Sequence, residues 1–98
     1  MAKIIYKFKI DVSDIQEIEM PFGSEVLKID TQLGIEGSHR FPSDCLQMWC
    51  MCPIDSTKIK RTFVVVATGS EFDDKGLKYI DSVIFKSTNL VYHIFEKI

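Results

Sequence analysis

The sequence predicts one small all-β domain, an antiparallel sandwich or partly open barrel of about seven strands. Apolar and polar residues alternate with a period of two in most segments, and those segments are rich in β-branched and aromatic residues. Turn residues recur between them at a spacing of roughly 8 to 14 residues, as in sandwiches and barrels built from hairpins. At 98 residues the chain is long enough for one domain and too short for two. Residues 1–98 are therefore expected to form a single domain.

The N-terminal third predicts three strands. Ile4–Ile10 places apolar residues at every second position, which is typical of a half-buried strand. Gln16–Met20 is a shorter alternating run, and Pro21–Ser24 follows it with proline early and glycine late, which favours a type I turn. Glu25–Gln32 mixes apolar and polar residues and predicts the third strand.

The longest predicted loop is Leu33–Asp44, which has no sustained periodicity and contains glycine, proline and serine. Long loops on compact β domains often carry function. Apolar side chains in an otherwise polar loop indicate either a lid or an interface. We therefore expect this loop to bind a partner, through Leu33, Ile35, His39, Arg40 and Phe41.

Two dense apolar runs are expected at the centre of the domain. Cys45–Cys52 is too short for an ordinary helix and ends at a proline, and Thr62–Thr68 is nearly continuous β-branched and aromatic sequence. Ile54–Lys60 is read as the polar connection between them. Both faces of the second run are expected to be covered, with Trp49 and Phe63 as core residues.

The C-terminal third predicts an acidic loop, Gly69–Gly76, followed by strands at Leu77–Phe85 and Leu90–Phe95. The terminal strands are the candidates for free sheet edges. Because a small open β domain exposes unpaired backbone groups, we expect it to pair edge to edge with a second copy as a homodimer.

Charge and composition disfavour several classes of function. The 12 basic and 14 acidic residues give a net charge of −2, whereas a domain that binds the phosphate backbone of nucleic acid usually shows a concentrated basic excess. No direct binding of nucleic acid is expected. The opening residues alternate charged and apolar side chains, and no apolar run approaches 18 residues, so neither a signal peptide nor a membrane span is expected. Three cysteines, an odd number, fit reduced thiols in the cytoplasm.

Four possible zinc ligands occur within 14 positions: His39, Cys45, Cys50 and Cys52. Their spacing departs from the paired C-x2-4-C knuckles of structural zinc sites, and we expect buried thiols, with neither a metal nor a cofactor. Cys45 is the one plausible reactive thiol, but the adjacent Asp44 raises the pKa expected for it. No credible catalytic set is found.

A ligand site is the alternative to a partner-binding loop. His93 shares a strand face with Val91 and Phe95, and is expected either as a hydrogen-bonded core residue or as part of a pocket. Thr68 and Gly69 begin a segment that follows an apolar strand. The backbone N–H groups of such a segment can bind a phosphate, but a simple turn is the favoured interpretation. The candidate ligand-binding residues are Arg61, Thr68, Gly69 and His93.

An ordered set of landmarks covers nearly the whole chain. It comprises Lys3–Ile10, Met20-Pro21 with Gly23, Trp49 four residues before Pro53, Arg61-Thr62-Phe63, Thr68-Gly69, Tyr79-Ile80 and the ending Val91–Glu96. This set resembles a family of short proteins found mainly in bacteriophages and prophages, which has no assigned chemistry. The chain departs from the family in having Ala67 where glycine is usual and in a longer segment before Trp49.

The resemblance implies a phage accessory protein in the host cytoplasm, and small proteins of this kind are often inhibitors of bacterial defence. The leading hypothesis is accordingly a non-catalytic protein that binds and inhibits a host protein, with a CRISPR or other defence effector as the candidate target. The alternative is an oligomeric sponge that sequesters a nucleotide signal around the ligand-binding residues named above.

Overall fold

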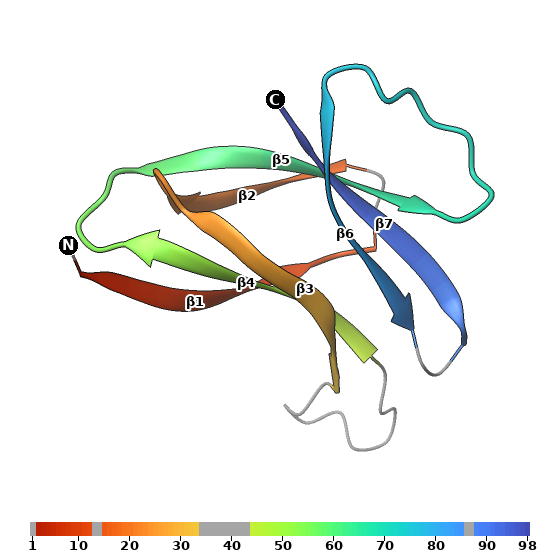
Figure 1. Ribbon diagram of the computed structural model, residues 1–98, viewed down its shortest axis with the longest axis horizontal. Coiled ribbons are helices and arrows are strands. Elements are labelled where there is room, and N and C mark those ends of the chain that lie inside the picture. Colours follow the sequence, from red (N-terminus) through yellow and green to blue (C-terminus); the bar gives the residue numbers. More distant parts are fainter. Residues whose placement is uncertain (1, 13–14, 34–43, 86–87) are drawn as a thin grey trace.

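Seven antiparallel strands form an open sandwich of two sheets (Figure 1), which confirms the predicted fold class. The computed structural model describes residues 2–12, 15–33, 44–85 and 88–98, with the backbone alone at residues 33, 44 and 45. The described ranges contain no helix long and apolar enough to cross a membrane. In chain order the strands are β1 (Lys3–Ile10), β2 (Ile15–Pro21), β3 (Glu25–Leu33), β4 (Asp44–Pro53), β5 (Lys58–Ala67), β6 (Leu77–Phe85) and β7 (Leu90–Lys97).

The two apolar strands expected at the centre lie in the interior of different sheets. β4 lies between β1 and β3 in a three-stranded sheet, and β5 lies between β2 and β7 in a four-stranded sheet whose other edge is β6. The expectation that both terminal strands are edges is correct for β1 and wrong for β7. β7 carries apolar residues on both faces, and a place between β5 and β6 keeps more of them from water.

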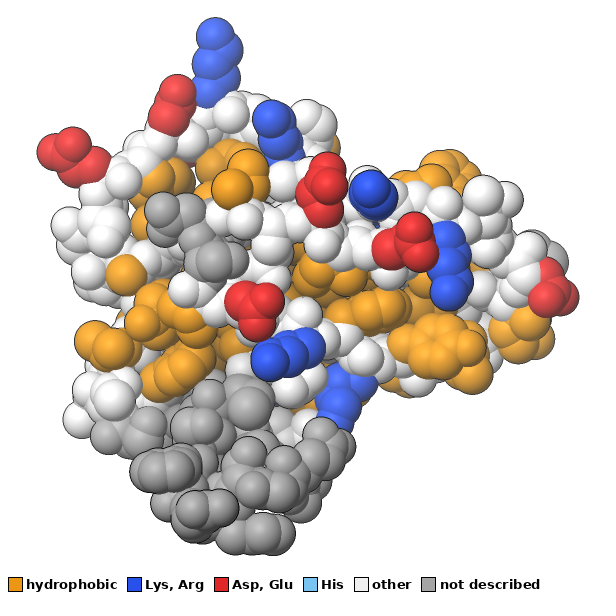
Figure 2. Space-filling view, turned by 180° about the vertical axis from the view of Figure 1, so that it is seen from behind, with side chains coloured by type: hydrophobic (Ala, Val, Ile, Leu, Met, Phe, Trp, Pro, Cys, Tyr) orange, Lys and Arg blue, Asp and Glu red, His pale blue; other side chains and the backbone are white. Residues whose placement is uncertain are grey.

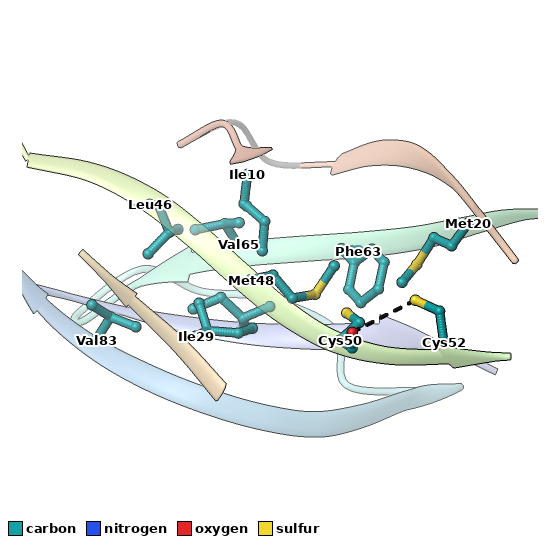
Figure 3. Close-up of a cluster of buried hydrophobic side chains, with 11 residues drawn as sticks. Ile10, Met20, Ile29, Leu46, Met48, Cys50, Cys52, Phe63, Val65 and Val83 are labelled. Atoms are coloured by element: carbon teal, nitrogen blue, oxygen red, sulfur yellow. Dashed lines mark hydrogen bonds between the residues drawn. The ribbon is translucent and has the colours of Figure 1, made fainter. Parts of the chain in front are cut away.

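The hydrophobic core lies between the two sheets (Figure 3). Alternate residues of β4, from Leu46 to Cys52, point inward and are 0 to 2% exposed. Phe63 of β5 is fully buried, and Figure 3 shows it among Met20 and side chains from β4. The cluster consists of Ile10, Met20, Ile29, Leu46, Met48, Cys50, Cys52, Phe63, Val65, Val83 and Ile94.

Trp49 is not a core residue, so that prediction was wrong. Its neighbours Met48 and Cys50 take the inward positions of β4, and strict alternation turns Trp49 to the outer face of the three-stranded sheet, where it is half-buried. The expectation for β5 is confirmed, because both of its faces are covered. Val65 points into the core, while Val66 on the opposite face is only 7% exposed.

The turn between β2 and β3 differs from the predicted type. Ser24 N–H donates to the Pro21 carbonyl at 3.1 Å, which closes a four-residue turn. Gly23 at its third position has a φ of 87°, the value of a type II turn rather than type I, and glycine is the residue that adopts this conformation without strain. β5 also begins at Lys58, inside the predicted connection, because residues as early as Lys58 pair with β2.

The two long sides of the sandwich are built differently. On one side β3 lies against β6, and Ile29 N–H of β3 donates to the Asp81 carboxylate of β6 at 3.2 Å. The other side is bounded by β1 and β2, which are edge strands of different sheets and are not paired with each other. Figure 1 shows the two running in opposite directions, with β1 beyond β2. The sandwich is therefore closed along one side and open along the other.

Candidate protein-binding surface

The outer face of the three-stranded sheet carries an exposed apolar row along its centre. Trp49 and Met51 alternate with buried residues of β4 and are both half-buried. Ile5 lies opposite Met51 on β1 and is 58% exposed. We call this surface the Trp49 face and define it by Ile5, Trp49 and Met51, together with the flanking lysines Lys7, Lys9 and Lys28.

The lysines surround the apolar row because the strand register places them beside it. Lys7 of β1 and Lys28 of β3 both lie opposite Trp49, one on each side of β4. Lys7 Nζ donates to Gln32 Oε1 at 2.7 Å. Lys28 lies 3.4 Å from an Asp30 oxygen, in a pair whose side chains are 66% and 44% exposed. Exposed pairs of this kind contribute little to stability, so the lysines remain available to a partner.

The composition of the Trp49 face matches that of protein interfaces. Tryptophan and methionine are enriched at interface centres, and a tryptophan that is partly exposed on a rigid strand can insert into a partner at a low entropic cost. A rim of lysines favours a partner with acidic groups around an apolar centre. This surface was not predicted from the sequence, because Trp49 was assigned to the core. The alternation of residues within β4 indicated that Trp49 and Met48 point to opposite faces.

The predicted partner-binding loop connects the two strands that border this face. Leu33 is the last residue of β3, and its backbone pairs with Asp44 at the start of β4. Ile35, His39, Arg40 and Phe41, together with the Leu33 side chain, lie outside the described residues. The loop therefore belongs to the same β3–β4 hairpin that carries Trp49.

Two of the predicted ligand-binding residues are brought together on the opposite surface of the molecule. His93 Nε2 lies 2.8 Å from Thr68 Oγ1, and His93 Nδ1 lies 2.7 Å from Ser82 Oγ, which is itself 2.7 Å from the Tyr79 hydroxyl. Gly69 has a φ of 92° in the turn that follows β5, so the turn interpretation of this segment is confirmed. Both ring nitrogens of His93 already have partners.

His93 is not an inward core residue, which was the more common of the two expected placements. Ile94, the next residue of β7, is fully buried in the core, so alternation places His93 on the outer face of the four-stranded sheet. There it lies opposite Val66 of β5 and Ser82 of β6. Its hydrogen bonds link the middle of β7 to the middle of β6 and to the residue that follows β5.

Arg61 lies apart from this group, on the inner face of β5. Its guanidinium donates twice to the Glu96 carboxylate, from Nε at 2.5 Å and from Nη2 at 2.7 Å, and Nη1 donates to the Ser24 carbonyl at 2.6 Å. The hydrogen bond to Glu96 raises the pKa of Arg61 above its ordinary value. Thr68 is seven residues farther along, or about 23 Å in extended strand. Glu96 and Ser24 were not predicted as partners of Arg61, since both are distant from it in the sequence.

The thiols of Cys50 and Cys52 are buried, as expected, on the inner face of β4. Cys52 Sγ donates to the Cys50 carbonyl at 3.6 Å (Figure 3). Burial, and then the neighbouring Cys52, raise the pKa of Cys50 to about 12, which keeps its thiol protonated at neutral pH. Within the described part of the chain, no three His, Cys, Asp or Glu side chains are grouped to hold a metal ion. His39 and the side chain of Cys45 lie outside that part.

A groove of about 520 Å³ lies along the open side of the sandwich. Residues of β1 line one wall, and the rest is lined by residues of β2, by the adjoining ends of β4 and β5 and by the connection between them. The β1 residues are Ile4, Tyr6, Lys7 and Phe8. Figure 2 shows hydrophobic side chains, with charged ones among them, at the end of the molecule where β1 begins. The groove is open to solvent, since Ile4 is 38% and Tyr6 is 47% exposed.

A family described as a domain of unknown function, DUF7352, matches residues 1–98. Neither a curated protein nor a solved structure matches the chain. Because the match covers every residue, the chain belongs to the DUF7352 family.

Proposed function

We propose that this protein is a non-catalytic, phage-type accessory protein that binds and inhibits a host protein, with defence effectors such as CRISPR nucleases as the first class to test. The observation that carries the proposal is the Trp49 face: a tryptophan turned outward on the central strand of a sheet, beside an exposed isoleucine and a rim of lysines. An outward tryptophan adds little to the core, and this placement suits it to a partner.

The chemistry of the face specifies the kind of partner. Trp49 and Met51 favour an apolar recess, and Lys7 and Lys28 on either side favour carboxylates around it. Charge pairing at the rim accelerates association and is weakened by salt, whereas the apolar centre determines the lifetime of the complex. The partner is therefore expected to present an acidic surface with an apolar centre.

A nucleotide sponge receives less support from the geometry. Arg61, the one cation of the proposed ligand set, is bound to Glu96 on the inner face, and His93 is hydrogen-bonded through both nitrogens on the outer face. A phosphate at Thr68 and His93 would have to break the existing hydrogen bonds and would lack Arg61 as a counter-ion.

The test is affinity capture from host cells with the wild-type chain and two matched variants, followed by reconstitution with the purified partner. Ile5→Asp alters the Trp49 face, and Ile84→Asp makes the same change at a position that is also 58% exposed, on the outer face of the other sheet. We expect one host protein to bind stoichiometrically to wild type and Ile84→Asp, in a salt-dependent complex that Ile5→Asp abolishes.

Two results would count against the proposal. Equal binding by both variants would remove the Trp49 face from the mechanism. If instead no partner is captured and a cyclic nucleotide raises the melting temperature of the wild type, the sponge is the better account, because a ligand that binds only the folded state stabilises it by mass action.

A further inference from the structure

We infer that two copies of this chain associate across their open sides, with β1 of each copy pairing with β2 of the other. The two free edges on the open side are complementary in charge. β1 contains three lysines and no acidic residue, whereas β2 contains two glutamates and no basic residue. This inference does not depend on the proposed function: it shares Lys7 and Lys9 with the Trp49 face, but it concerns the free backbone edges of β1 and β2, and its test measures self-association.

The charges on each edge point to the outer face of their own sheet. Lys7 and Lys9 of β1 lie on the face opposite to the buried Ile10. Glu17 and Glu19 of β2 are exposed and alternate with Ile18 and Met20, which pack in the core. A strand pair formed from these edges places lysines beside glutamates on the outside and apolar residues beside apolar residues on the inside.

The directions of β1 and β2, and the positions of their residues along the strand axis, are compatible with a twofold axis parallel to the strands. Figure 1 shows β1 and β2 running in opposite directions. Hydrogen bonds between Asp11 and Gln16 hold the end of β1 level with the start of β2. A twofold rotation about an axis parallel to the strands does not change the position of any residue along that axis. It places the four-stranded sheet of the second copy in the same layer as the three-stranded sheet of the first. β2 of the second copy therefore lies beside β1 of the first copy and runs antiparallel to it. Lys9 then lies near Glu17 of the second copy, and Lys7 lies near its Glu19.

The same rotation covers the apolar surface that the open side exposes. Inward-facing residues of β4 are fully buried at Cys50 and Cys52, but their partners on β1, Tyr6 and Ile4, are 47% and 38% exposed. In Figure 1, β1 lies beyond the edge strand β2 of the other sheet. In the dimer, β1 of the second copy occupies the layer beneath β1 of the first, and the walls of the two grooves pack together.

Other edge pairings are less favourable. Pairing β1 with its own copy would bring together six lysines, three from each chain, and like charges on adjacent strands are destabilising. The edges β3 and β6 already lie against each other and share the hydrogen bond from Ile29 to Asp81. The β1–β2 pairing is isologous, so the dimer closes on itself and does not extend into a fibre.

The test reverses the charges one edge at a time. Sedimentation equilibrium of the wild type should give a particle of twice the 11.3 kDa chain mass. Glu17→Lys/Glu19→Lys and Lys7→Glu/Lys9→Glu should each raise the dimer dissociation constant roughly a hundredfold, because four attractive pairs become repulsive. All four side chains are exposed, and circular dichroism should show that both variants remain folded.

Mixing the two variants provides the decisive observation. An equimolar mixture restores both complementary pairings and should form a heterodimer with about wild-type affinity, as should the homodimer of the quadruple variant that carries all four changes. A wild-type monomer at 100 µM overturns the inference. A dimer that persists in Glu17→Lys/Glu19→Lys overturns it as well, as does a mixture that stays monomeric.

Discussion

Truncation of Phe63 tests whether the core is centred between β4 and β5. Phe63 is fully buried among side chains of both sheets, so Phe63→Ala removes the transfer energy of the ring and leaves a cavity. Such changes cost about 3 to 5 kcal/mol. The Arg61 guanidinium, 5.9 Å from the ring centroid, would also lose a cation–π contact. A domain of this length has a total stability of about 5 to 15 kcal/mol, so the variant should be marginally folded.

Trp49→Ala is the matched comparison, because Trp49 is a larger aromatic residue on the outer face. Solvent fills the space that it leaves, and we expect a loss of about 1 to 2 kcal/mol. Urea unfolding followed by far-UV circular dichroism serves both variants, since the fluorescence signal disappears with Trp49. At about 4 °C per kcal/mol, the melting temperature should fall by about 12 to 20 °C for Phe63→Ala and by about 4 to 8 °C for Trp49→Ala. Equal losses would refute the assignment of inner and outer faces.

Three further perturbations probe the polar groups of the sandwich. Arg61→Met should lower the free energy of unfolding by about 3 kcal/mol, because it leaves the half-buried Glu96 carboxylate without its cation. The added change Glu96→Leu should recover part of that loss. A double-mutant cycle on urea unfolding measures the coupling between the two residues. Asp81→Ala should destabilise by about 1 to 2 kcal/mol through the unpaired Ile29 N–H, and hydrogen exchange at that amide should accelerate, whereas unchanged exchange would argue against the β3–β6 link. Because the folded-state pKa of Cys50 is raised from 9.0 to about 12, its contribution to stability is complete below pH 9 and is lost as the pH rises from 9 to 12. The free energy of unfolding of the wild type should therefore fall more steeply over that window than that of Cys50→Ala, as measured by urea titrations at each pH.

The strands and the fold class could be predicted because alternation is a local property. The pattern of β1 or β4 shows which residues share a face, but it does not show which face is inside when both contain large apolar residues. Trp49 and Met48 were equally plausible core residues on that basis, and the choice between them depends on the opposing sheet. His93 illustrates the same ambiguity, since it shares its face with apolar residues that lie outside the core.

The polar contacts could not be predicted, because their partners are distant in sequence. Arg61 and Glu96 are 35 positions apart, and Ile29 and Asp81 are 52 positions apart. Each pair depends on the strand order of the two sheets, and many orders are compatible with the same seven strands. The ligand set of Arg61, Thr68, Gly69 and His93 was assembled by residue type. Arg61 lies in the first half of β5 on the inner face, whereas Thr68 follows the end of β5 and contacts His93 on the outer face.

The position of Trp49 on β4 connects the fold to the proposed function. β4 is hydrogen-bonded on both sides and anchored below by fully buried side chains, so the backbone that carries Trp49 is among the most constrained in the domain. A partner that binds there gains the contact area of the indole ring without the cost of ordering a flexible segment. If β1 and β2 pair between two copies, the sheet that carries Trp49 is extended by the four strands of the second chain. The dimer would then display two Trp49 faces, and a partner with two matching sites would bind with higher avidity than either face alone supplies.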